Sequence, residues 1–229
     1  MHYGAPTERF VASKYPAATI AVVGGSTARN QRTATSDIDL LLIGDDPFLD
    51  DRSAEAASHA FEGETFEVFA YTWSAFSEWA QRDLDRHRPV IVRMLVDGLP
   101  VRDDGRLAGL RRVWIEKLRN GPTTSSEDLA LRRYIIADLI DDLRDARDPV
   151  EQHVIAAMLY ERSAELMLLS GGQWIATGKW LPRVLRDFDG GRASALSAPL
   201  VVGDHLALAD AAETELRRAG GRPSDGFVR

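Results

Sequence analysis

The most constraining feature of this chain is a pair of short motifs joined by a brief polar connection. An apolar run ends in Val22-Val23-Gly24-Gly25-Ser26, and ten residues after that serine begins Ser36-Asp37-Ile38-Asp39-Leu40-Leu41-Leu42. Side chains alternate along a strand, so two acids one residue apart leave the same face if the second run is a strand. The chain must therefore turn at two glycines and then present two carboxylates on one face of a strand.

This combination suits a phosphate-bearing ligand and a hard divalent cation. Gly24 and Gly25 let the backbone approach phosphate closely, and free N–H groups at the start of a helix bind anions. Ser26 suits a helix cap or a phosphate oxygen. Asp37 and Asp39 are oxygen ligands of the kind that Mg²⁺ prefers. Together these residues predict phosphoryl or nucleotidyl transfer, although each motif alone is also typical of an ordinary turn or strand start.

The residues Gly25, Ser26, Asp37 and Asp39 carry a resemblance to the nucleotidyltransferase superfamily that includes DNA polymerase beta and kanamycin nucleotidyltransferase. The pattern of that family has a third acid on a later strand, and Glu67 lies between apolar neighbours at a suitable distance downstream. The resemblance implies two Mg²⁺ ions held by these three acids. It also implies a nucleoside triphosphate as co-substrate, with ATP as the first candidate. Alternatively, Glu67 is an ordinary outward-facing strand residue.

The connection between the two motifs departs from the family at one position. Small bacterial members have a glycine after the Ala-Arg that follows the serine, whereas this chain has Asn30. Asparagine tolerates the left-handed conformation that such a glycine adopts, so the turn is expected to survive. Arg29 and Arg32 are both candidates to approach the phosphates, and for Arg32 the favoured interpretation is a mobile surface residue.

Hydrophobic periodicity predicts alternating elements followed by helices. The expected elements are a helix over 7–15, strands over 18–23, 38–43 and 65–72, a helix over 52–61, a helix over 74–85 capped by Ser74, an ambiguous segment over 90–96 and a short edge strand over 99–102. From about Arg106 onward the pattern is helical, with a break at 120–122 and a capping Ser125. The expected fold class is α+β, with an α/β domain with a mixed sheet over residues 1–104 and a helical bundle over 105–229.

The helical half carries acids that invite a functional interpretation. Acids at positions 138, 141, 142 and 145 stack like charges four residues apart, which disfavours the helix slightly. They form either a wall that attracts a polyamine-like substrate or a solvated face offset by Arg144 and Arg147.

A single acid, Glu161, lies in a largely apolar arc of the next predicted helix. The apolar residues of that arc are Val154, Ala157, Met158, Ala164 and Leu168. Burial there favours a general base that takes the proton of an acceptor hydroxyl, whereas the alternative is a pair with an arginine. Further along, Lys179 lies among Trp174, Trp180 and Arg183, where it either reaches a nucleotide phosphate or belongs to a helical cap with the tryptophans in the core.

Composition bounds the remaining choices. The net charge of −7 and the pI near 5.3 argue against a long nucleic acid as partner, since such surfaces need clustered Lys and Arg. The chain has no cysteine, no signal-peptide pattern and no bilayer-length apolar run, so a cytoplasmic monomer or homodimer without membrane contact is expected. The resulting hypothesis is Mg²⁺-dependent transfer of a nucleotide to a hydroxyl of a small, aminoglycoside-like acceptor. The alternatives are AMP transfer to a protein, or a catalytically lapsed binding module.

Overall fold

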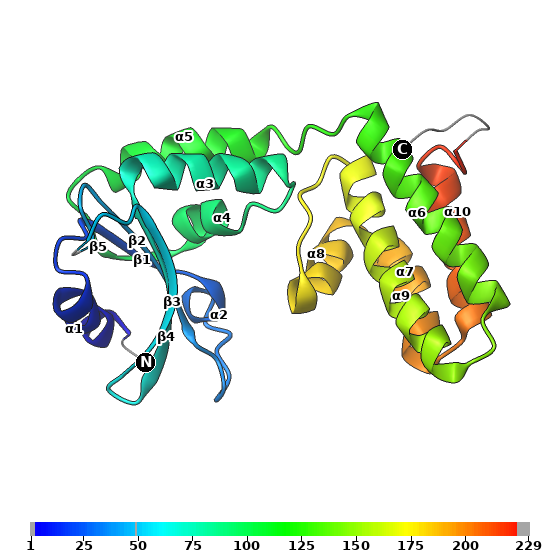
Figure 1. Cartoon of the computed structure of the whole chain (residues 1–229), viewed down its shortest axis with the longest axis horizontal. Coiled ribbons are helices and arrows are strands. Elements are labelled where there is room, and N and C mark those ends of the chain that lie inside the picture. The colour runs from blue at the N-terminus through cyan, green and yellow to red at the C-terminus, as the bar shows by residue number, and fades with distance from the viewer. Residues whose placement is uncertain (1–2, 49, 224–229) are drawn as a thin grey trace. The chain divides into compact units, whose positions relative to one another are not determined.

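The computed structural model describes residues 3–48 and 50–223, which fold into two compact units. The first unit spans Met1–Asn120 and the second Gly121–Arg229, and each has its own hydrophobic core. The predicted α+β class is confirmed, with a mixed sheet in the first unit and helices throughout the second (Figure 1). In the part of the chain that the structure describes, no helix combines the length and the apolar character needed to cross a bilayer.

The first unit is built on a five-stranded sheet in the order β3-β4-β2-β1-β5 (Figure 1). Its strands are β1 (Ile20–Val23), β2 (Ile38–Gly44), β3 (Ala54–Phe61), β4 (Glu64–Thr72) and β5 (Leu99–Arg102). Only β2 and β4 pair in parallel, and the other neighbours are antiparallel. The helices are α1 (Gly4–Lys14), α2 (Gly25–Ala28), α3 (Trp73–Asp85), α4 (Val90–Asp97) and α5 (Leu107–Arg119).

Alternation along the strands separates two faces of this sheet. Phe10 of α1 stacks on Phe66 of β4 with ring centroids 4.2 Å apart, and β2 contributes Ile38, Leu40 and Leu42 to the same core. On the opposite face, Tyr71 of β4 packs against Phe76 of α3. Asp39 and Glu67 have the parity of Tyr71, so they belong to the face that carries α3.

The predicted helix over 52–61 is wrong, because this segment forms β3. Its alanines favour a helix locally, but a two-residue turn pairs the segment with β4 from Phe61 opposite Glu64 onward. Glu62 and Gly63 both have positive φ, 51° and 81°, which is the geometry of a tight hairpin turn. Pairing with β4 therefore overrides the local preference.

Other boundaries differ from expectation in smaller ways. The cap of α3 is Thr72, whose Oγ1 accepts the Ala75 N–H, whereas Ser74 lies inside the helix. The ambiguous segment over 90–96 is helix α4, and β5 is the expected edge strand. The compact first unit runs past residue 104 because Arg111 of α5 donates to carbonyl oxygens of Leu95 and Gly98 at 2.8 and 2.7 Å.

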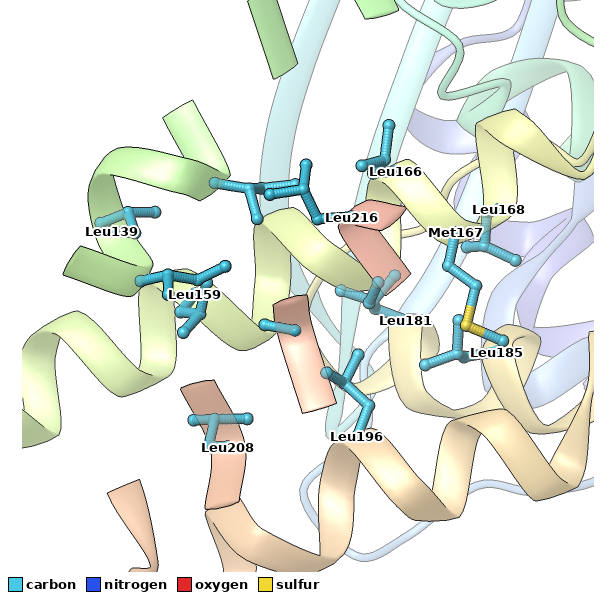
Figure 2. Close-up of a cluster of buried hydrophobic side chains, with 14 of the residues drawn as sticks. Leu139, Leu159, Leu166, Met167, Leu168, Leu181, Leu185, Leu196, Leu208 and Leu216 are labelled. Atoms are coloured by element: carbon cyan, nitrogen blue, oxygen red, sulfur yellow. The ribbon is translucent and has the colours of Figure 1, made fainter. Parts of the chain in front are cut away.

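The second unit consists of helices around one core of aliphatic side chains. They are α6 (Ser126–Asp145), α7 (Pro149–Ser170), the short 3₁₀ helix η1 (Gly178–Trp180), α8 (Leu181–Phe188), α9 (Gly190–Val202) and α10 (His205–Arg218). Ser125 caps α6 as predicted, accepting the Asp128 N–H at 3.0 Å. Figure 2 shows leucines of all five α-helices meeting in this core.

Candidate functional site

A sharp turn at the end of β1 forms one side of the candidate site. The Gly24 N–H donates to the carbonyl oxygen of Asp39 at 2.8 Å, which ties the turn to β2. Gly25 has φ +58°, and a Cβ placed on it would lie 1.6 Å from Asp39 Oδ2. A side chain at this position is thus excluded twice, by the backbone conformation and by the carboxylate against it.

The rest of the turn is closely packed. A Cβ on Gly24 would lie 2.9 Å from Cγ of Met94, so α4 packs against the backbone at this point. Ser26 and Thr27 are both buried in α2. Asn30 adopts φ 54°, so it takes the left-handed conformation expected of it.

The second side of the site is formed by acids on two neighbouring strands. Asp39 of β2 lies opposite Glu67 of β4 in the parallel register, and Asp37 immediately precedes β2. The pKa of Glu67 is raised, first by partial burial and then by the negative charges of Asp39 and Asp37. Glu67 therefore lies near enough to both Asp39 and Asp37 to be repelled by their charges.

This arrangement fits a divalent cation in the chemistry of its donors. The donors are three carboxylates, which Mg²⁺ favours, and their mutual repulsion is what a bound cation would relieve. Over residues 3–48 and 50–223, no three acidic or histidine side chains are gathered into a ready-made metal cluster. The assignment of Asp37, Asp39 and Glu67 as metal ligands stays a prediction.

The arginines of the connection differ in their surroundings. Arg29 lies 3.9 Å from a carboxylate oxygen of Asp97 and is partly exposed, and its contact with phosphate stays a prediction. The prediction that Arg32 is a mobile surface residue is wrong, because its guanidinium bonds both the Ser36 carbonyl and the Glu64 carboxylate. The sequence alone did not predict this role. Many arginines of this chain lie close to acids in the sequence, and nothing in the sequence distinguishes Arg32 from them.

Two predicted site residues lie in the second unit. Glu161 is on α7, and the apolar arc around it is less buried than expected, with Val154 56% and Met158 45% exposed. The buried carboxylate of α7 is Glu165, which pairs with Arg132 at 3.3 Å and Arg162 at 3.2 Å.

Lys179 is exposed on η1, and the neighbouring Trp180 is partly buried with the Arg183 guanidinium 4.6 Å from its ring centroid. Trp174 is buried, as in the core alternative. The functional roles assigned to Glu161 and Lys179 stay predictions.

The acidic face of α6 is partly neutralised, both by the expected Arg144 and by Arg222, which was not expected. Arg222 donates to both carboxylate oxygens of Asp141 at 2.7 and 2.9 Å. Arg144 bonds Asp210 and Glu213 of α10, and its charge also contributes, after that of Arg222, to lowering the pKa of Asp141.

Comparison with known proteins agrees with this geometry. Residues 7–97 match the family of nucleotidyltransferase domains, a range that includes Gly24, Gly25, Ser26, Asp37, Asp39 and Glu67. No curated protein matches the sequence. Among solved structures, a nucleotidyltransferase-like protein from Exiguobacterium sibiricum 255-15 is similar, with a TM-score of 0.52 and 16% identity over 95% of this chain and 75% of that one. At that identity the likeness concerns the fold. Over residues 7–97 the chain is therefore similar in sequence to nucleotidyltransferase domains, and its fold is similar to that of a nucleotidyltransferase-like protein.

Proposed function

We propose that this protein transfers a nucleoside monophosphate from a nucleoside triphosphate to a hydroxyl group of a small molecule in a Mg²⁺-dependent reaction. ATP is the first candidate for the triphosphate. The observation that carries the proposal is the contact between the Gly25 turn and the Asp39 carboxylate. Backbone suited to phosphate and a carboxylate suited to a cation meet there, where the end of β1 lies beside the start of β2. Pyrophosphate is the second product.

The residues of the first unit divide the work as follows. Gly25 and Ser26 bind the β- and γ-phosphates, through their backbone N–H groups and the Ser26 hydroxyl. Asp37, Asp39 and Glu67 are the residues that would hold Mg²⁺. When bound, this ion orients the α-phosphate and offsets the charge that develops as pyrophosphate leaves.

For the acceptor we propose a small polycation of the aminoglycoside kind. The support is electrostatic, since the protein carries a net charge of −7 and exposes Asp138, Asp142 and Asp145 along α6. Such a surface raises the local concentration of a cationic substrate and lowers that of a nucleic acid.

The first experiment measures thermal unfolding with Mg²⁺ and each nucleoside triphosphate, for the native chain, Asp39→Asn and Asp46→Asn. Asp46 is an exposed acid beyond the far end of β2, so its substitution is a matched control. A ligand at 100 times its Kd stabilises the folded state by about 2.7 kcal/mol. We expect a Mg²⁺-dependent shift for the native chain and the control, and its loss in Asp39→Asn.

The acceptor is then sought with α-labelled triphosphate. Label transferred to an aminoglycoside supports the full proposal, and label on a protein band redirects it to AMP transfer from the triphosphate to a protein hydroxyl. Nucleotide binding without any transfer leaves a lapsed binding module. No binding of any triphosphate contradicts the proposal.

A further inference from the structure

Asp37 lies just outside the part of β2 that is held by the sheet. The ladder between β2 and β4 begins at Ile38, opposite Phe66, so strand pairing does not fix the residue before it. What fixes the backbone at this point is Arg32, whose Nε and Nη2 donate to the Ser36 carbonyl oxygen at 3.0 and 2.9 Å. That carbonyl belongs to the peptide unit that leads into Asp37.

The same guanidinium reaches the strand that carries Glu67. Arg32 Nη1 donates to Glu64 Oε1 at 3.1 Å, and Nη2 bonds the other oxygen of this carboxylate. Glu64 is the first residue of β4, three positions before Glu67. Arg32 thus connects the backbone before one predicted metal ligand to the strand of another.

The surroundings make this connection rigid. The Arg32 side chain is only 17% exposed, and its Cζ lies 5.3 Å from the centroid of the Tyr3 ring. The turn that Arg32 holds is closed on itself, because the Ser36 N–H donates to the Thr33 carbonyl and the Thr33 N–H donates to Ser36 Oγ at 3.0 Å. One arginine therefore anchors a preformed turn, not a loose loop.

We propose that Arg32 is a positioning residue that holds Asp37 beside Asp39 and Glu67, so that the three carboxylates are arranged to receive a divalent cation. The inference rests on the proposed function. Three carboxylates repel one another, and the one outside the ladder has the most freedom to move away. An arginine fork with two partners opposes that movement better than a lysine, which is a single point charge.

The test compares Mn²⁺ binding, measured by electron paramagnetic resonance of the free ion, in the native chain, Arg32→Ala, Arg32→Lys and Arg9→Ala. Arg9 of α1 is the matched control, since it makes two bonds, at 2.9 and 2.6 Å, to the carboxylate of Glu62. Glu62 lies in the turn of the same β3–β4 hairpin as Glu64 but away from the site. Loss of a group that orients metal ligands costs roughly 10- to 100-fold in metal affinity. We expect that loss in Arg32→Ala, a partial loss in Arg32→Lys, and native affinity in Arg9→Ala.

Hydrogen exchange of the metal-free protein gives a second readout, independent of the cation. We expect faster exchange of the Ser36 amide in Arg32→Ala and no change there in Arg9→Ala. If Arg32→Ala does not fold, Glu64→Gln takes its place in the test. This variant keeps Arg32 but removes the negative charge of Glu64 that pairs with the guanidinium.

The outcomes separate the two claims. A native chain that binds no Mn²⁺ defeats the proposed function. A native chain that binds Mn²⁺ with the same affinity as Arg32→Ala, or as Glu64→Gln in its place, leaves the proposed function standing and overturns the role of Arg32.

Discussion

Replacing Gly25 by alanine changes two things at once, and a control in the same unit separates them. The left-handed backbone costs about 1–2 kcal/mol for any other residue. The added Cβ also displaces the Asp39 carboxylate, which lies 1.6 Å from its place. Gly63 has φ +81° but open space around its Cβ position. We expect Gly25→Ala and Gly63→Ala both to lower the unfolding temperature. Only Gly25→Ala should abolish the rise in unfolding temperature that Mg²⁺ and a triphosphate cause. Equal shifts in the two variants would contradict the assigned contact.

The charge at Glu67 gives a pH-dependent prediction. Its pKa is raised by burial and by Asp39 and Asp37, so the ionised carboxylate destabilises the folded state. This penalty is fully present above the folded-state pKa and disappears as the pH falls below the ordinary value of a glutamate. Without metal, Glu67→Gln should therefore raise the unfolding temperature at neutral pH and lose that advantage in acid. With Mg²⁺ present, we expect only the native chain to gain stability.

Among the elements, α4 depends on a carboxylate from α3. Asp83 accepts the Ile91 N–H at 2.9 Å, at the start of the helix that presses Met94 against the Gly24 turn. Asp83→Ala leaves that amide without its acceptor, which we expect to cost about 1–2 kcal/mol in urea unfolding. Asp83→Asn keeps an acceptor and should cost less. Asp85, which accepts a hydrogen bond from the exposed Gln81, supplies the control, and an equal effect of Asp85→Ala would refute the capping role.

The elements that could be predicted are those in which local pattern and tertiary packing agree. A buried strand such as β2 can be predicted from its continuous apolar residues. The start of α6 can be predicted from Ser125, which stands just before acidic residues. The error at β3 arose because alanine favours helices while the deciding turn, Glu62-Gly63, is only two residues long. At the site, Gly25 and Asp39 could be predicted from their motifs. The pairing of Arg32 with Glu64 could not, because it joins residues 32 apart in the sequence.

At the scale of the whole molecule, the two compact units make a prediction about fragments. Residues 1–120 and 121–229 each contain a complete core and are expected to unfold cooperatively when produced separately. A fragment that stops at residue 104 lacks α5, and with it the bonds of Arg111 and the packing of Trp114 on Phe76. Circular dichroism melting should show the shorter fragment to be markedly less stable than 1–120. Equal stability would place the boundary before α5.

The edge strand β5 has a consequence for how this protein behaves at high concentration. It has only four residues, includes Pro100 without an N–H to donate, and pairs with β1 through an irregular register between Ala21 and Val22. Short length, proline and bulges are the means by which natural sheets discourage edge-to-edge aggregation. On this side the sheet offers a poor template for a strand from a neighbouring molecule, so fibre-like growth is discouraged at this edge.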